Sequence, residues 1–419
     1  MEKVEDILHV MRQEDGTTSD ALYRRFGPPG KKDIVLQLGG NDPNDVQECV
    51  ERLLRSGYSF NEINLNCGCP SIEKGGAKTF GASLMKEPDL TARLLEAMRA
   101  GIFNSDVAVG NHIDVSLKCR IAVYDTPEEM SMFARATTSA EDDYSLMYEN
   151  LHHYISHAVQ ADAGLSHMIL HARPVVLGGM SPTKNRQVPE LNYDIVHQIA
   201  NDFPGLDVTL NGGIKSMDEL NELHLMARNR FRNNDAHGHH EKRINMISFM
   251  AGRWMLRRPL DIIHIRDVFG DNSRQYASGD RVETLITNAI SQYMDYIDGQ
   301  LKSSNKLRVN PLSELCLPLY LVSEQLREDY KEFYSGVDLY DSEGIVAGIT
   351  VLRSDEEFEA VYSGLRDVAI YLSELGSQRK KSTKGVPPEE INWKKLSLFF
   401  QGVVGKKIGN KWKKNRAEL

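Results

Sequence analysis

The chain has 419 residues, 41% of them hydrophobic, which is enough for one large domain with an appendage or for two domains. Five cysteines, no apolar leader at Met1 and no eighteen-residue apolar run argue against a disulfide-stapled secreted scaffold and against a membrane protein. We therefore expect a soluble protein of a reducing compartment, with the cytoplasm as the default, and no membrane partner.

The net charge of −9 argues against a nucleic-acid partner, because Lys and Arg drive phosphate binding. The charge is unevenly distributed, however. Residues 379–419 carry 12 Lys and Arg against 3 Asp and Glu, a local charge of +9. A basic C-terminal segment on an otherwise acidic chain indicates a polyanionic partner that binds at this segment.

Short apolar runs rich in β-branched residues alternate with segments of helical period, which predicts an α/β fold with a parallel sheet buried on both faces. The first helix has Asp42 as its cap, Pro43 in its first turn and Gly57 as its stop. The predicted strands are Asp33–Leu38, Glu62–Asn66, Asp114–Cys119, Met168–His171, Asp207–Leu210 and Ile244–Met250. Residues 101–112, 137–144 and 229–242 are predicted to be loop insertions.

Polar residues suited to chemistry follow the predicted strand ends, where a (β/α)8 TIM-type barrel builds its active site. They are Gln37, Asn66, Cys69, Lys118, Arg120, His171, Arg173, Asn211 to Gly213, Gly252 and Arg253. Only six strands are predicted, and the 32 residues before Asp33 are too few for two further βα units. Beyond about Asp267 the strand pattern stops, and a helical second domain is predicted.

Cys67 and Cys69 lack a second Cys or His pair at zinc spacing, so no metal site is predicted there. The run His237–His240 fits a solvated polar loop better than a metal site. Buried filler is the simplest interpretation of Cys67. Cys69 differs because Gly68 and Pro70 force a turn at a strand end, so its thiol is a candidate nucleophile or proton donor.

Two consecutive glycine loops, Thr209–Ser216 and Phe249–Met255, each join a strand to a helix start. Successive backbone N–H groups and a helix dipole favour phosphate there, with Arg253 as a charged clamp. Lys118 and Arg120 share one face of their strand, and two charges that point inward indicate an anionic or electron-rich ligand. Alternatively, the strand end is exposed and both side chains are solvated. Gln37, inside an apolar strand, needs a polar partner such as a ring carbonyl.

Together these residues resemble the tRNA-dihydrouridine synthases, most closely the bacterial and plant subfamily that acts on D-loop positions 20 and 20a. The specific signatures are "NCGCPS" and "SPTKNRQVPEL". The matching stretches are Val35–Pro43, Tyr58–Ser71, Phe80–Met85, Val115–Ile121, Leu170–Val196, Asn211–Ser216, Ala251–Met255 and Leu398–Lys413.

The resemblance implies FMN in a (β/α)8 barrel, reduction by NADPH, and a helical C-terminal domain that holds tRNA. Cys69 would protonate uracil C5 while hydride reaches C6. Asn66, Arg173 and Arg120 would lie near the substrate. The residues expected to bind FMN are Gln37, Lys118, His171, Asn211, Gly212, Gly213, Gly252 and Arg253.

The expected domains are an N-terminal helical remnant (residues 1–32), an incomplete flavin-binding barrel (33–266) and a helical tRNA-binding domain (267–419) with an acidic insertion at about 302–385. The first two strands of the family, with their Pro-Met and Thr-Glu-Met residues, have no counterpart in this sequence. The family's usual Gly after the motif at Lys118–Ile121 is Ala122.

Three functions remain open at this point. The first is an active flavin-dependent tRNA reductase, expected to be a monomer. The second is a catalytically impaired RNA-binding paralogue with an opened barrel. The third is a flavin barrel acting on a small molecule such as dihydroorotate, against which the basic aromatic C-terminal segment argues. The sequence does not decide which uridine is reduced or whether NADPH is preferred to NADH.

Overall fold

The computed structural model describes residues 1–12, 18–27, 29–70, 80–105, 112–136, 140–235, 247–259, 261–262 and 325. The chain divides into two compact units, residues 1–214 with 222–251 and residues 215–221 with 252–419. The predicted helical domain from residue 267 on, its acidic insertion and its basic end lie outside the described residues, apart from the helical Gln325. The proposed domain boundaries therefore stay a prediction.

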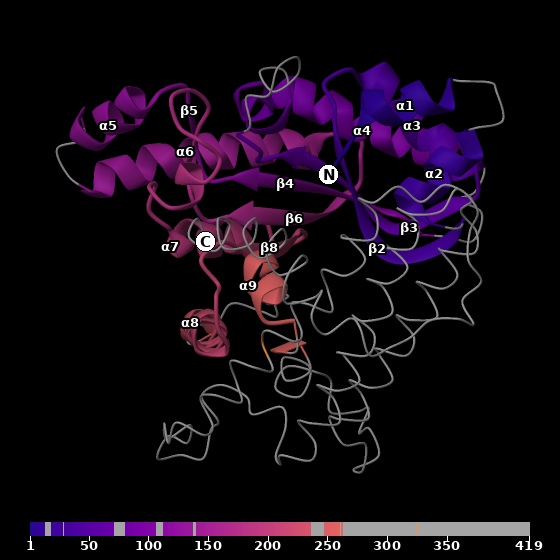
Figure 1. Ribbon diagram of the computed structural model, residues 1–419. Helices are drawn as coiled ribbons and strands as arrows, with labels where there is room; N and C mark the ends of the chain where they lie inside the picture. The colour runs from indigo at the N-terminus through magenta and orange to yellow at the C-terminus, as the bar shows by residue number, and fades with distance from the viewer. Residues whose placement is uncertain are drawn as a thin grey trace, which may run out of the picture. The chain divides into compact units, whose positions relative to one another are not determined.

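The first unit is built on a parallel sheet of seven strands in the order β1-β2-β3-β4-β6-β8-β9 (Figure 1). Its strands are β1 (Glu2–Lys3), β2 (Gly30–Gly39), β3 (Tyr58–Cys67), β4 (Asp114–Arg120), β6 (Leu165–His171), β8 (Asp207–Asn211) and β9 (Ser248–Met250). The predicted α/β class is confirmed. Five predicted strands lie inside observed ones, and the sixth, expected over Ile244–Met250, is described as Ser248–Met250.

Strand β1 was not predicted from the sequence. Its two residues pair with Leu38 and Gly39, at the carboxyl end of β2. A second small sheet joins β5 (Val123–Tyr124) to β7 (Val175–Val176). Such short strands carry no readable periodicity, so sequence patterns miss them.

Helices alternate with the strands, as a parallel sheet requires. They are α1 (Val4–Met11), α2 (Thr18–Phe26), α3 (Pro43–Arg55), α4 (Pro88–Asn104), α5 (Pro127–Ala136), α6 (Ala140–Gln160), α7 (Tyr193–Asp202), α8 (Met217–Asp235) and α9 (Gly252–Arg257), with 3-10 helices η1 (Gly81–Lys86) and η2 (Lys184–Arg186). The prediction of loops at residues 101–104, 140–144 and 229–235 was wrong, because these residues end α4, begin α6 and end α8.

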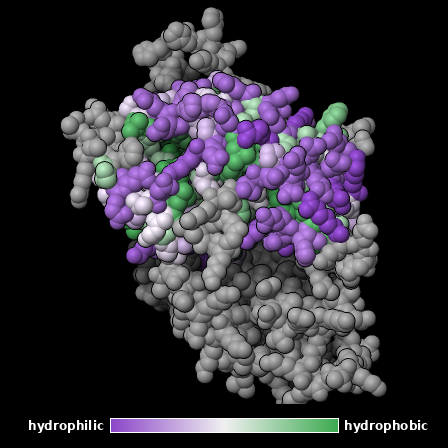
Figure 2. Space-filling model, turned by 90° about the horizontal axis from the view of Figure 1, so that it is seen from above, coloured by the Kyte–Doolittle hydropathy of each residue, from purple (hydrophilic) through white to green (hydrophobic). Residues whose placement is uncertain are grey.

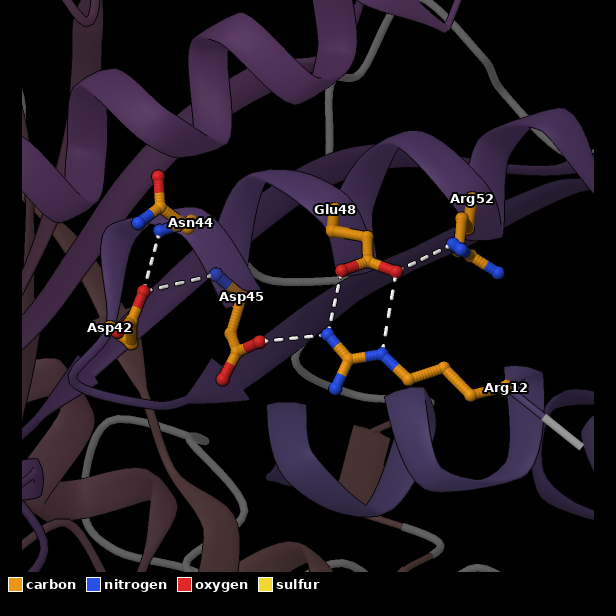
Figure 3. Close-up of polar contacts among 6 residues, drawn as sticks. All are labelled: Arg12, Asp42, Asn44, Asp45, Glu48 and Arg52. Carbon is orange, nitrogen blue, oxygen red and sulfur yellow. Dashed lines mark hydrogen bonds and ion pairs between the residues drawn. The ribbon is translucent and has the colours of Figure 1, made fainter.

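Helix α3 forms where the sequence predicted it. The Asp42 carboxylate caps its N-terminus by accepting from the backbone N–H groups of Asn44 at 2.8 Å and Asp45 at 3.2 Å (Figure 3). At its other end Gly57 adopts a positive φ of 86°. Arg12, next to the end of α1, forms ion pairs with Asp45 at 3.0 Å and with Glu48 at 2.6 Å, so α1 is tied to α3 on the exposed side.

The two faces of the sheet differ in chemistry. The face toward α1, α3, α4 and α6 is apolar, since Leu65, Cys67, Leu117, Cys119 and Leu170 are buried there with exposures of 0%. Seen from above, the surface of the described residues is mostly hydrophilic, with smaller hydrophobic patches (Figure 2). The side chains that alternate with the apolar ones on β3 and β4 are polar, so the opposite face of these strands carries hydrogen-bonding groups, whereas β6 contributes the apolar Ile169 to it.

In the second unit, a buried carboxylate organises the residues around α9. Asp261 is only 4% exposed, and it accepts hydrogen bonds from Trp254 Nε1 at 2.7 Å and Arg258 Nε at 2.9 Å. It also accepts from Gln325 Nε2 at 2.8 Å, a residue 64 positions further along the chain. These bonds satisfy a buried charge that would otherwise be costly.

Candidate active site

The polar face brings most of the predicted site residues together at the carboxyl ends of the strands. Asn66 of β3 pairs in register with Lys118 of β4. Two residues further along, Arg120 pairs with His171 of β6, which pairs with Asn211 of β8. Residues that pair directly across parallel strands point to the same face, so these five side chains share one surface.

Cys69 is presented by the turn that ends β3. The Asn66 side-chain oxygen accepts from the backbone N–H groups of Gly68 at 3.3 Å and Cys69 at 3.1 Å, so the strand end fixes the turn. A Cβ at Gly81 would lie 2.7 Å from the Cys69 carbonyl, which explains the glycine there. The Cys69 side chain is half-buried, whereas Cys67 is fully buried and desolvation raises its thiol pKa to about 12.

Lys118 is a half-buried cation of the site. Its Nζ donates to Asn211 Oδ1 at 2.8 Å, while Asn211 Nδ2 donates to the Met250 carbonyl at 2.8 Å, so the amide is oriented from both ends. Burial, together with the positive charge of Arg120, lowers the pKa of Lys118 to about 8. A lysine in this state favours an anionic or electron-rich ligand, because such a ligand offsets the cost of keeping the charge.

The Arg120 side chain is buried under the loops at the carboxyl ends of the strands and is not exposed on their surface. It is 4% exposed, and its guanidinium donates to the carbonyls of Gly68 at 3.2 Å, Pro174 at 3.4 Å and Asn185 at 3.3 Å. One side chain therefore connects the turn that carries Cys69 with the two loops that follow β6 and β7. The planar, five-donor guanidinium is suited to such a junction.

The loop with the "SPTKNRQVPEL" signature is anchored by Asn185, which is fully buried. Its Oδ1 accepts from Val176 N at 2.7 Å, and its Nδ2 donates to Val176 O at 2.8 Å. Arg173 also reaches this loop, where its Nη1 donates to the carbonyls of Gln187 at 3.3 Å and Pro189. Arg173 is thus held beside the loop, at the carboxyl side of β6.

The first predicted phosphate loop needs its glycines for space and for conformation. Gly212 and Gly213 have φ values of 108° and 83°, in the region that side chains disfavour. A Cβ at Gly212 would lie 2.5 Å from His171 Cδ2, and one at Gly213 would overlap the Tyr193 hydroxyl. His171 therefore packs directly against this backbone.

The second predicted phosphate loop is described only in part. Gly252 and Arg253 open α9 directly after β9, as the sequence predicted. They belong to the second unit, whereas Gly212 and Gly213 belong to the first. Their joint role in phosphate binding stays a prediction.

Sequence reasoning missed a set of polar residues on the amino-terminal side of the site. Asn64 and Ser116 are fully buried on the same face as Asn66 and Lys118. Glu62 accepts from Ser116 Oγ, and its other oxygen lies 2.9 Å from His167 Nδ1. The alternation of polar residues in "EINLN" was the available signal, since positions 62, 64 and 66 must share a face.

A separate cleft of about 440 Å³ lies between η1, β5 and α6, and none of the predicted site residues line it. Among the described residues, no group of three or more His, Cys, Asp or Glu is placed to hold a metal ion. No helix in the described part of the chain is both long and apolar enough to cross a membrane.

Comparison with known proteins shows the relationship that the motifs indicated. A sequence model of the dihydrouridine synthase (Dus) family matches residues 7–140 and 146–276, more than half of the chain. The chain belongs to the dihydrouridine synthase family. The predicted resemblance is confirmed, and the sites described above lie within the matched residues, whereas the basic residues 379–419 lie beyond them.

Several curated relatives in this family are bacterial proteins. The chain is 37% identical over 192 residues to the tRNA-dihydrouridine(20/20a) synthase of Vibrio cholerae, covering 46% of this chain and 49% of the relative. It is 34% identical over 194 residues to that of Synechocystis sp., covering 46% and 48%. A longer match, 28% over 274 residues, covers 65% of the chain and 64% of the Shewanella oneidensis protein. The chain spans about half the length of the first two relatives.

Proposed function

We propose that the chain is a flavin-dependent oxidoreductase that reduces uridine to 5,6-dihydrouridine in the D-loop of tRNA, at position 20 or 20a. The observation that carries this proposal is the Cys69 thiol, half-buried at the end of β3 and held there through Asn66, on the same edge of the sheet as Lys118 and Asn211. The family match and the names of the bacterial relatives support the same activity.

The residues on the polar face fit FMN. Gln37, Lys118, His171 and Asn211 offer side chains that can bind the edge of an electron-rich ring, and the lowered pKa of Lys118 fits a site that is completed by an acceptor. The backbone N–H groups of Gly212 and Gly213, two successive residues with positive φ angles, are candidate donors to a phosphate, with Gly252 and Arg253 as further candidates. Bound FMN, once reduced by NADPH, supplies the hydride for uracil C6.

In the proposed reaction, the residues of this chain orient the reacting groups and transfer a proton. Cys69 donates its thiol proton to uracil C5, and the hydrogen bonds of Asn66 to the Cys69 turn fix the position of the sulfur. The placement of Arg120 under three loop carbonyls supports an orienting role, in place of the direct substrate contact expected from the resemblance. Arg173 remains the candidate for contact with the nucleotide.

Substrate tRNA would be held by shape and charge. The target uridine must leave its stack to reach Cys69, because a stacked base offers no access to C5 and C6. We assign the binding of the tRNA phosphate backbone to the basic residues 379–419, because Lys and Arg side chains suit phosphate contacts. A monomer in the cytoplasm is the expected working form, which sedimentation and imaging of a tagged chain can test.

A direct experiment combines cofactor and product. The purified chain, reconstituted with FMN and supplied with NADPH and unmodified tRNA, is expected to show flavin absorbance and to convert one D-loop uridine. Mass spectrometry of nuclease digests detects the gain of two hydrogens and identifies the position. A chain that binds FMN but leaves every uridine unchanged would exclude this function.

A second candidate is an RNA-binding paralogue that has lost the flavin reaction. The observation in its favour is that β1 pairs with β2 through only two residues in the described part of the sheet. This candidate predicts tRNA binding by a chain that cannot be reconstituted with FMN. The same reconstitution therefore separates the two.

A further inference from the structure

A directed chain of hydrogen bonds begins at Glu62, on the amino-terminal side of the polar face. Ser116 Oγ donates to Glu62 Oε1 and accepts from Asn64 Nδ2 at 2.7 Å. Asn64 and Ser116 have no exposed surface, and the Glu62 side chain is 13% exposed. Bulk water is therefore a poor substitute partner for either of the two buried groups.

The same chain continues to the turn that carries Cys69. Gln37 Nε2 donates to Asn64 Oδ1 at 2.8 Å, and Asn66 Nδ2 donates to Gln37 Oε1 at 2.9 Å. Asn66 Oδ1 then accepts from the backbone N–H groups of Gly68 and Cys69. Three amides and one hydroxyl thus connect a carboxylate on β3 to the backbone of Cys69.

The two ends of this chain impose the same direction on it. An ionised carboxylate can only accept a hydrogen bond, and a backbone N–H can only donate one. Reversing any single amide between them would place two donors or two acceptors face to face. The carboxylate is kept ionised: burial would raise the pKa of Glu62, but the hydrogen bonds from His167 and Ser116 outweigh it and lower that pKa.

We propose that Glu62 is a positioning residue for the Cys69 site: its carboxylate sets the direction of the hydrogen-bond chain and so the orientation of the amides of Asn64, Gln37 and Asn66. Glu62 touches neither the turn nor the expected substrate; it acts through Ser116. The link to catalysis rests on the proposed function, in which Gln37 faces the flavin and Asn66 faces the uracil. The direction of the chain itself needs no ligand.

Asn66→Asp tests the direction by creating a conflict. The new carboxylate still accepts from the N–H groups of Gly68 and Cys69, but it can no longer donate to Gln37. Two acceptors then face each other, since Gln37 is held in its orientation by Asn64. We expect the unfolding midpoint to fall by about 5 °C and alkylation of Cys69 by iodoacetamide to become several-fold faster.

Glu62→Gln in the Asn66→Asp background should remove the conflict. The amide introduced at position 62 can donate to Ser116, after which Ser116 donates to Asn64, Asn64 to Gln37, and Gln37 to the new carboxylate. Every link is satisfied again in the reverse direction, while the oxygen of the introduced amide still accepts from His167. The double variant is therefore expected to recover more than half of the lost unfolding midpoint and the slow alkylation of Cys69.

Glu62→Gln also removes one negative charge, which alone could offset the destabilisation by Asn66→Asp without any effect on the direction of the hydrogen-bond chain. Ser116→Ala separates these two explanations. This substitution interrupts the chain but leaves both charges in place. If direction is transmitted through the chain, Glu62→Gln no longer rescues Asn66→Asp when Ser116 is replaced. Persistent rescue in the Ser116→Ala background would show that charge alone is responsible and would overturn the proposal.

Asn61→Asp is the matched control, because Asn61 precedes Glu62 on β3, is exposed and takes no part in the chain. Glu62→Gln should not rescue it. Should Asn66→Asp be insoluble, recovery of soluble protein in the double variant is the readout, and failure to recover it contradicts the proposal. All measurements use the full chain without flavin, so their outcome does not depend on the proposed reaction; FMN titration of the same variants tests the link to the cofactor.

Discussion

Lys118 Nζ donates a hydrogen bond to Asn211 Oδ1 at 2.8 Å, and the two residues belong to β4 and β8, which are separated in the sheet by β6. In the register of the sheet, Lys118 pairs with Ile169 of β6, and Asn211 pairs with His171 of the same strand. A long side chain therefore bridges three strands at the carboxyl side of the sheet. Because burial and Arg120 lower its pKa to about 8, the charge of Lys118 depends on what binds there.

The affinity for FMN should depend on pH through Lys118. An acceptor ligand binds the protonated amine better, so affinity is expected to be constant below about pH 8 and to fall by up to tenfold per pH unit above it. Fluorescence quenching of FMN between pH 6 and pH 10 measures this. Lys118→Gln should bind more weakly and lose the step near pH 8, and a step of the same size in that variant would contradict the assignment.

The same group makes the stability of the flavin-free chain pH dependent. The pKa of Lys118 is about 8 when folded and 10.5 as the ordinary value, so between these pH values the unfolded chain binds more protons. Stability contributed by this group is therefore lowest below pH 8 and rises from pH 8 to pH 10.5. Urea unfolding of wild type and Lys118→Gln should diverge over that window, with wild type gaining relative to the variant as pH rises.

Cys69→Ala should abolish dihydrouridine formation while leaving FMN binding intact, since the thiol is the proposed proton donor and its side chain is not among the expected cofactor contacts. The rate constant for reduction of tRNA is expected to fall by at least about a hundredfold. Cys67→Ala is the matched control two residues away. Its thiol is buried on the helix side, so it should lose stability but keep turnover per folded molecule. Wild-type turnover by Cys69→Ala would refute the assignment.

Arg120→Met is expected to loosen three loops at once. It leaves the carbonyls of Gly68, Pro174 and Asn185 without the buried guanidinium, which should cost about 2–4 kcal/mol of folding free energy. If Arg120 orients Cys69, kcat should fall more than the affinity for tRNA. Arg12→Met is the control, because Arg12 is exposed and pairs only on the surface, so the unfolding midpoint should hardly move.

The fold was predictable to the extent that it depends on periodicity and punctuation. Asp42, Pro43 and Gly57 fix α3 by local chemistry, and the apolar runs mark strands β2, β3, β4, β6 and β8 because buried parallel strands need them. Strand β1 has two residues, so its position depends on pairing with β2, which no local pattern encodes. The extension of α6 back to Ala140 was missed because acidic residues at a helix start resemble a loop.

The site was predictable residue by residue but not as a network. Alternation showed that Lys118 and Arg120 share a face, yet their partners come from other strands and loops, such as Asn211 and Asn185. Whether an arginine faces a ligand or supports a loop depends on those distant contacts. The polar chain from Glu62 was missed for the same reason, since each link between two of its side chains joins residues 27 to 54 positions apart.

Gly213→Ala should destabilise the chain for two separable reasons. Its φ of 83° is strained for any side chain, and an added Cβ would overlap the Tyr193 hydroxyl and lie 2.6 Å from Leu191 Cδ1. A total loss of about 2–4 kcal/mol of folding free energy is expected.

Tyr193→Phe in the same chain removes the hydroxyl, so the double variant should lose less than the sum of the two single variants and retain the backbone strain and the close contact with Leu191. Gly205→Ala provides the reference, because nothing lies within 4 Å of a Cβ there. Urea unfolding of the four variants and wild type completes the cycle. Strict additivity of Gly213→Ala and Tyr193→Phe would mean that the tyrosine hydroxyl does not define the space beside this backbone.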